Sequence, residues 1–218
     1  MVATPVRRVL SPRYRRVSFL FTRPGARPRT TLPDLDLLYL DDHLVVADKP
    51  AGLLCVPGRG PDKADCLAAR VQAAVPDALV VHRLDMGTSG LVVFARGLAI
   101  QRALSIAFAQ RRVSKRYEAI VAGCPEADAG SVELPLIVDW PNRPRQIVEH
   151  TVGKPSLTHW RVLSRDPQAG TARLALTPVT GRTHQLRVHL AAIGHPILGD
   201  ELYATPAAHA ASPRLLLH

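Results

Sequence analysis

One aspartate, Asp85, lies in a short polar loop between two apolar runs. Residues 79–81 are typical of a short buried strand, and residues 90–95 of a second strand rich in β-branched and aromatic side chains. Two strands on either side fix the direction of the carboxylate, and no partner of the usual hydrolytic kind accompanies it. An ionised aspartate can act as a covalent nucleophile. It can equally cap a turn, since Asp is common in turns, and the residue types alone leave both roles open.

The residues around Asp85 are more specific than the aspartate itself. Residues 82–90, HRLDMGTSG, resemble the catalytic motif HRLD-x-x-TSG of the RluA family of pseudouridine synthases, with every fixed letter present. Residues 112–123, RVSKRYEAIVAG, and residues 180–203, TGRTHQLRVHLAAIGHPILGDELY, resemble the family's second and third motifs in the same order. The resemblance runs from about Leu37 to the C-terminus. It implies an isomerase that converts uridine to pseudouridine in RNA and needs neither a cofactor nor a metal.

Three further segments narrow the resemblance. Residues 52–60 (GLLCVPGRG), 134–144 (LPLIVDWPNRP) and 212–218 (SPRLLLH) look like the dual-specificity RluA branch of the family. That branch implies two substrates, a uridine in a large-subunit rRNA hairpin and a uridine at the 5′ side of the tRNA anticodon loop. In the family the closing R-L-L-L-H is followed by a further strand, whereas this chain stops at His218. We therefore expect a truncated C-terminus that lacks one strand of the sheet.

The resemblance also implies catalytic roles. Asp85 would be the nucleophile, and attack at C1′, attack at C6 and assistance to elimination at C2′ all stay open. A carboxylate in a pocket that excludes water stays ionised only beside a cation. The family pattern assigns that cation to Arg187, which follows Leu186, with Arg182 as the second choice. Arg187 could instead be an ordinary solvated helix residue.

Two more residues would handle the base. Tyr117 offers a flat surface for the uracil, and stacking of this kind contributes about 1–3 kcal/mol per base in single-strand binders. Its hydroxyl could also take the C5 proton, although a tyrosine with its ordinary pKa near 10 is a poor base. Arg83 would enter the RNA stack and fill the gap left by the extruded uridine. His82 would orient the loop rather than perform acid-base work.

Two rival functions follow from the same residues. A metal-dependent nuclease or phosphatase could use Asp85 with Asp139 or Asp200, but no second acid lies at a fixed short spacing from Asp85. A non-catalytic RNA-binding or ribosome-assembly protein could keep the synthase fold. His184 and His189 are five residues apart, unlike the four of H-E-x-x-H, so a zinc site is not indicated.

Composition points to a globular protein with a basic tail. The 218 residues are 47% apolar without an apolar run near the length of a membrane span, and three cysteines without C-x-x-C spacing fit a reducing cytoplasm. The net charge is +10, but residues 1–33 hold eight arginines and no acid, which leaves 20 bases and 18 acids for residues 34–218. The tail could bind RNA phosphates, form a disordered leader or transit peptide, or reflect a misplaced start codon. We expect a monomer that binds rRNA and tRNA stem-loops and no membrane.

The pattern of elements predicts an α+β fold with a mixed or antiparallel sheet rather than a doubly wound one. The resemblance implies a pseudouridine-synthase-like form of this fold, with a mainly antiparallel sheet, flanking helices and a catalytic cleft. We divide the chain into a disordered tail, residues 1–33, and one catalytic domain, residues 34–218. Strands are predicted at 37–39, 44–49, 115–122, 158–163 and 172–177, and helices at 66–75, 98–111 and 183–193. Asp65 is expected to cap the first helix and Gly194 to end the last.

Overall fold

The computed structural model describes residues 30–32 and 35–218, and its strands form three sheets. The strands are β1 (Thr30–Leu32), β2 (Leu35–Leu40), β3 (Leu44–Lys49), β4 (Ala78–Val80), β5 (Gly90–Arg96), β6 (Tyr117–Ala122), β7 (Ala129–Glu133), β8 (Leu136–Val138), β9 (Gln146–Val148), β10 (Leu157–Asp166) and β11 (Thr171–Pro178). The helices are a 3-10 turn (Pro61–Lys63), α1 (Leu67–Ala74), α2 (Leu98–Ala109), α3 (Gln185–Ala192) and α4 (Pro206–Ala210).

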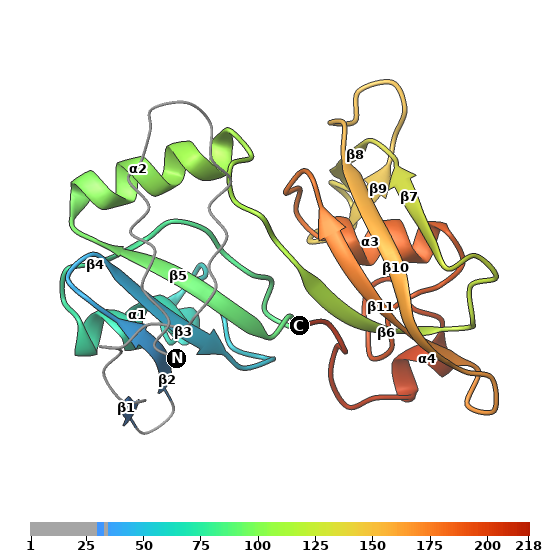
Figure 1. Ribbon diagram of the computed structural model, residues 1–218, viewed down its shortest axis with the longest axis horizontal. Coiled ribbons are helices and arrows are strands. Elements are labelled where there is room, and N and C mark those ends of the chain that lie inside the picture. The colour runs from blue at the N-terminus through green and yellow to red at the C-terminus, as the bar shows by residue number, and fades with distance from the viewer. Residues whose placement is uncertain (1–29, 33–34) are drawn as a thin grey trace, which may run out of the picture.

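The first lobe, residues 30–32 and 35–109, is built on a five-stranded sheet in the order β1-β2-β3-β5-β4. Its core joins alternate residues of the central strands to the inner face of α1, with Val45, Phe94, Leu67 and Val71 almost fully buried. In Figure 1, α2 lies above these strands and α1 below them. The polar loop that follows β4 and carries Asp85 is therefore held between two paired strands.

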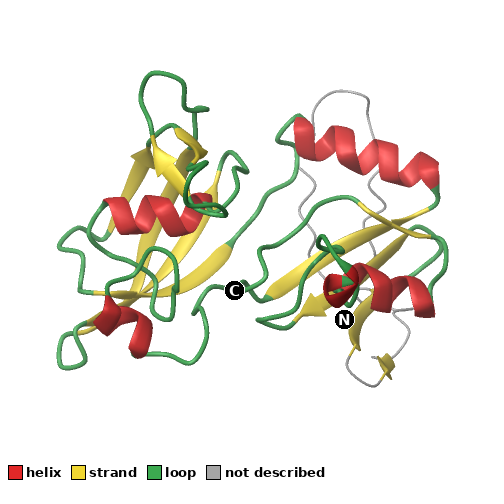
Figure 2. Cartoon of the chain, turned by 180° about the vertical axis from the view of Figure 1, so that it is seen from behind, coloured by secondary structure: helices red, strands yellow, loops and turns green. Residues whose placement is uncertain are grey.

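The second lobe, residues 117–218, has a four-stranded sheet in the order β6-β11-β10-β7 and a two-stranded hairpin of β8 and β9. Leu174 and Leu176 of β11 pack with Leu190 of α3 and with Ile197 in its core. A loop leads from α2 into β6 and connects the two lobes (Figure 2). Each lobe thus has its own apolar cluster.

The last residues of the chain lie between the lobes (Figure 1). The backbone of His218 exchanges hydrogen bonds with Glu118 on β6, at 2.7 and 2.9 Å. On the other side, Ser89 of the first lobe donates its N–H to the carbonyl oxygen of Leu217 at 3.1 Å. The residues up to His218 therefore pair with the edge of β6 and link it to the loop of Asp85.

The predicted α+β class is confirmed, with differences in detail. Every strand pair in the described part of the chain is antiparallel, and the strands divide between two main sheets because each half has its own core. The first sheet begins at Thr30, inside the segment predicted as a tail, and residues 1–29 lie outside the described residues.

The predicted cap of the first helix was wrong by one residue. Cys66, not Asp65, is the N-cap, because its backbone is extended and its sulfur accepts the N–H of Ala69 at 3.4 Å. The carboxylate of Asp65 instead accepts two hydrogen bonds from Arg70, at 2.8 and 2.7 Å. Cys66 is fully buried, so the small side chain both caps the helix and joins the core.

Candidate active site

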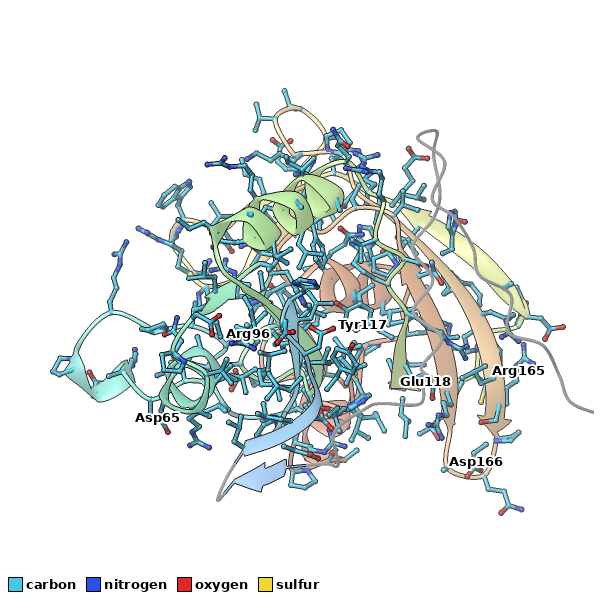
Figure 3. All side chains as sticks on the ribbon, turned by 60° about the vertical axis from the view of Figure 1, so that its left-hand side comes forward. Asp65, Arg96, Tyr117, Glu118, Arg165 and Asp166 are labelled. Atoms are coloured by element: carbon cyan, nitrogen blue, oxygen red, sulfur yellow. The ribbon has the colours of Figure 1, made fainter. Side chains whose placement is uncertain are left out.

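A cavity of about 310 Å³ lies where the two lobes meet. The loop after β4, the start of β6, the segment between β11 and α3, and Leu217 all contribute to its wall. In Figure 3, Tyr117 lies near the middle of the molecule, whereas Arg165 and Asp166 lie at the outer turn between β10 and β11. Volumes from about 300 Å³ upward are usual for small-ligand pockets.

All of the residues predicted for the site line this cavity. They come from three separate parts of the chain and are His82, Arg83, Asp85, Tyr117, Arg182, Leu186 and Arg187. Arg83 and Arg182 are exposed, whereas Leu186 and Arg187 are buried. The fold therefore brings the three sequence motifs to one place.

Asp85 keeps its carboxylate partly open to the cavity. Its side chain is 27% exposed, and the nearest ring nitrogen of His184 lies 4.0 Å from its Oδ1 atom. The backbone of the loop is closed by a hydrogen bond from the N–H of Thr88 to the carbonyl oxygen of Asp85, at 3.1 Å. Thr88 is itself buried, so this side chain anchors the turn in the protein interior. The geometry presents the carboxylate to a ligand in the cavity.

A buried lysine holds the backbone of this loop in place through hydrogen bonds. Lys49, at the end of β3, is fully buried, and its ammonium donates to the carbonyl oxygens of Pro50, Leu53 and Met86 at 2.9, 2.7 and 2.9 Å. Burial lowers the pKa of Lys49 to about 8, although the charges of Cys55 and Asp85 oppose that shift. Because Met86 follows Asp85 directly, the lysine fixes the loop and places a cation near the carboxylate.

Tyr117 lies at the first position of β6, packed against the cores of both lobes. Burial, helped by the charge of Asp85, raises its pKa to about 12. The phenolate form is therefore scarce at neutral pH. This favours the flat stacking surface over the proton acceptor as the contribution of Tyr117.

Two contacts within the protein hold the His82 ring in place. Its Nε2 atom accepts the backbone N–H of Val93 on β5 at 3.0 Å, and its ring stacks on Phe108 of α2 with centroids 4.7 Å apart. Burial, with the charge of Lys115, lowers the pKa of His82 to about 4. The neutral imidazole thus anchors the start of the loop, in agreement with an orienting role.

Arg187 makes a different ion pair from the one expected. Its guanidinium donates from Nε and Nη2 to the two carboxylate oxygens of Asp200, at 2.8 and 2.6 Å, and both side chains are almost completely buried. Burial would lower the pKa of Arg187, but the hydrogen bonds to Asp200 and the charges of Asp200 and Asp85 raise it overall. Asp85 therefore acts on Arg187 through space, without the direct pairing that the sequence suggested.

Sequence reasoning missed a second layer of polar residues. His184 has a left-handed backbone with φ of 54°, and its Nδ1 atom lies 2.7 Å from the hydroxyl of Tyr203. That hydroxyl accepts the backbone N–H of Gln146 at 2.8 Å, and the Arg187 guanidinium lies 5.2 Å from the tyrosine ring centroid. Burial lowers the pKa of His184, against the opposing charge of Asp85.

Some of these residues left a signal in the sequence. Lys49 follows Val45 and Ala47 at alternate positions of one strand, a pattern that places it on the buried face. His184 carries no such signal beyond its spacing from His189, which does not fit a zinc site. The ring of His189 instead lies within hydrogen-bonding distance of Ser156 and Thr158, at 2.8 and 3.0 Å. Among residues 30–32 and 35–218, no three potential metal ligands gather.

The comparisons with known proteins agree with this geometry. The chain matches the RNA pseudouridylate synthase family over residues 43–192. It belongs to this family. It is 52% identical over 186 residues to the dual-specificity RNA pseudouridine synthase RluA of Escherichia coli (strain K12), covering 85% of this chain and 84% of the relative. The corresponding protein of Pasteurella multocida (strain Pm70) is 52% identical over 188 residues, covering 86% and 85%.

Solved structures show the same fold. The human RNA pseudouridylate synthase domain containing 1 superposes with a TM-score of 0.72 at 28% identity, covering 90% of this chain and 79% of the human one. This RluA-family member is therefore an RNA pseudouridine synthase, an isomerase that converts uridine to pseudouridine in RNA. The non-catalytic alternative is not favoured.

No helix in the described part of the chain is long and apolar enough to cross a membrane.

The lowered pKa of the partly buried His82 predicts how stability depends on pH. Its pKa is about 4 in the folded chain and near 6.5 when unfolded. Between these values the unfolded chain binds a proton that the folded chain does not, so the free energy of unfolding should fall as pH is lowered from about 6.5 to about 4. His82→Gln, whose amide can still accept the Val93 N–H, should flatten this slope by up to about 1.4 kcal/mol per pH unit. Urea unfolding at several pH values measures it, and an unaltered slope would contradict the assignment.

The Arg187–Asp200 pair predicts strong coupling. Arg187→Met leaves a buried carboxylate without its cation and should cost about 3 kcal/mol or more of folding stability. Asp200→Asn should also destabilise, because it leaves the buried Arg187 guanidinium without its negative partner, although the amide oxygen can still accept the backbone N–H groups of Leu202 and Tyr203. In the double variant the loss should be clearly smaller than the sum of the single losses. Additive losses in urea unfolding would show that the pair is not coupled.

Proposed function

We propose that this enzyme forms pseudouridine in two folded RNAs, a large-subunit rRNA hairpin and the 5′ side of the tRNA anticodon loop, with Asp85 as the nucleophile. The observation that carries the proposal is the carboxylate of Asp85 on the wall of a 310 Å³ cavity that all three family motifs line. The dual-specificity name of relatives that are about half identical supports the choice of substrates.

The reaction needs little beyond a nucleophile, a pocket and proton handling. The N1–C1′ bond of uridine breaks, the uracil turns, and a C5–C1′ bond forms. C5 then loses its proton and N1, which carries no proton in uridine, gains one, so the product is an isomer of the substrate. Asp85 supplies an electron pair that assists the first bond cleavage, and the carboxylate is released again before the product leaves. Lys49 and Arg187 keep positive charge near the carboxylate while the base is bound.

The remaining cavity residues bind the substrate. Tyr117 stacks on the uracil, and Leu186 provides an apolar wall beside it. Arg182 and Arg83 are exposed and meet the RNA at the cavity mouth, where Arg83 fills the gap in the RNA stack. His82 contributes indirectly by fixing the loop. A planar guanidinium recovers part of the few kcal/mol that extruding a base costs.

The setting of the enzyme follows from its substrates and its cysteines. We assign the enzyme to the cytoplasm for two reasons. Its proposed rRNA and tRNA substrates are found there, and thiols stay reduced there. Cys55, Cys66 and Cys124 are all free in the structure. The predicted site residues that line the cavity all belong to one chain, which supports the proposal of a monomer.

The first test of this proposal is Asp85→Asn. The amide is nearly isosteric but has no negative charge and cannot attack, so pseudouridine formation should stop while RNA affinity stays within a few-fold. Tritium release from RNA labelled at C5 of uridine measures turnover, and filter binding measures affinity. Normal turnover by this variant would remove Asp85 from the mechanism.

The second test separates base extrusion from bond cleavage. Arg83→Ala should slow anticodon and rRNA stem-loops far more than an RNA whose target uridine is mismatched or already extruded, because less unstacking is needed there. Single-turnover assays with excess enzyme compare these substrates, with a fully paired duplex of the same sequence as the unreactive control. Equal slowing of every substrate would exclude the extrusion role, and stem-loops that gain no pseudouridine would exclude the substrate assignment.

A further inference from the structure

The loop between β8 and β9, residues 139–145, carries an exposed aromatic side chain. Trp140 is 62% exposed, and the guanidinium of Arg143 lies 4.1 Å from the centroid of its ring. The arginine covers one face of the indole, and the exposure leaves indole surface open to solvent. An indole backed by a cation is a good stacking platform for a nucleobase, because every base has a π-face.

The loop holds its own shape. The N–H of Asp139 donates to the carbonyl oxygen of Arg145 at 2.9 Å, and the N–H of Arg145 donates to that of Asn142 at 3.0 Å. The Asn142 amide also donates to the Asp139 carboxylate at 3.0 Å, which engages the one acid of residues 139–145. A loop ordered before binding loses little conformational entropy when a ligand arrives. Trp140 is thus presented on a preformed support.

The loop is also connected to the catalytic cavity. Gln146, the residue after the loop, donates its N–H to the hydroxyl of Tyr203 at 2.8 Å, and Tyr203 contacts His184, which lies 4.0 Å from Asp85. The guanidinium of Arg145 lies 5.5 Å from the centroid of the Tyr203 ring. The contacts that run from the end of the loop to the candidate nucleophile thus pass through two side chains, those of Tyr203 and His184.

We propose that residues 139–145 form a second RNA-binding site, in which an unpaired base beside the target uridine stacks on Trp140 while Arg143 and Arg145 neutralise the adjoining phosphates. This inference rests on the proposed function, because it takes the occupant to be the loop of a stem-loop substrate. Stacking holds the strand without reading its sequence. The site would therefore favour RNAs with an open loop next to the target, whatever the base there.

Fluorescence tests the contact directly, because the chain has only two tryptophans, Trp140 and Trp160. In Trp160→Phe the emission comes from Trp140 alone, and anticodon or rRNA stem-loop RNA should quench it and protect it from acrylamide. The matched control is Trp140→Phe, in which Trp160 reports alone. Trp160 is partly buried in the second lobe's core, so RNA should leave its emission nearly unchanged.

Affinity and turnover give the second measurement. Trp140→Ala should weaken stem-loop binding by about tenfold or more, whereas Trp140→Phe should keep most of the affinity. The single-turnover rate of Trp140→Ala at saturating RNA should stay within a few-fold of the unaltered chain, because Trp140 is not part of the cavity wall. Stem-loop binding by Trp140→Ala that matches the unaltered chain would overturn the proposal.

The outcomes separate this proposal from the proposed function. Pseudouridine formed in the stem-loops, with Trp140 emission unchanged and Trp140→Ala binding normally, would overturn the second site alone. Quenching of Trp140 by stem-loops that gain no pseudouridine would support the second site and reject the substrate assignment. Failure of the unaltered chain to bind either stem-loop would overturn both.

Discussion

Burial of charge at the junction of the two lobes is the constraint on which the site depends. Lys49 and the Arg187–Asp200 pair are almost entirely removed from water, and a buried charge is costly unless it is paired or fully hydrogen-bonded. Three carbonyl oxygens satisfy Lys49, and a bidentate carboxylate satisfies Arg187. Lys49 fixes the backbone at Met86, next to Asp85, and Asp200 also accepts the backbone N–H groups of Leu202 and Tyr203. The two cations that feel the charge of Asp85 are thus also structural elements of the fold.

The ends of elements from both lobes meet at this junction. The loop of Asp85 follows β4, Tyr117 opens β6, and Leu217 lines the same cavity. The C-terminus marked in Figure 1 lies between the two lobes. Because the final residues pair with β6 and also bind Ser89, a relative shift of the lobes would break backbone hydrogen bonds as well as apolar contacts. The same contacts that join the lobes therefore define the cavity.

The polar residues behind the cavity connect it to the surface. Tyr203 accepts a hydrogen bond from the β8–β9 hairpin and contacts His184 beside Asp85. Its ring also lies near two guanidinium groups, those of Arg145 and Arg187. One tyrosine thus joins the hairpin, the buried ion pair and the catalytic wall. A substrate bound to the hairpin loop and to the cavity would contact a single connected network.

The sequence by itself determined the motif residues, most strands and the α+β class, because alternating apolar residues and fixed letters such as HRLD-x-x-TSG are local patterns. The residues predicted for the site, among them Asp85, Tyr117 and Arg187, all line the cavity. Only the tertiary structure decided which charges pair. Arg187 and Asp200 lie 13 residues apart, and Lys49 bonds to Met86 across 37 residues. Such contacts depend on the packing of separate elements, and the same side chains would be equally compatible in sequence with other partners.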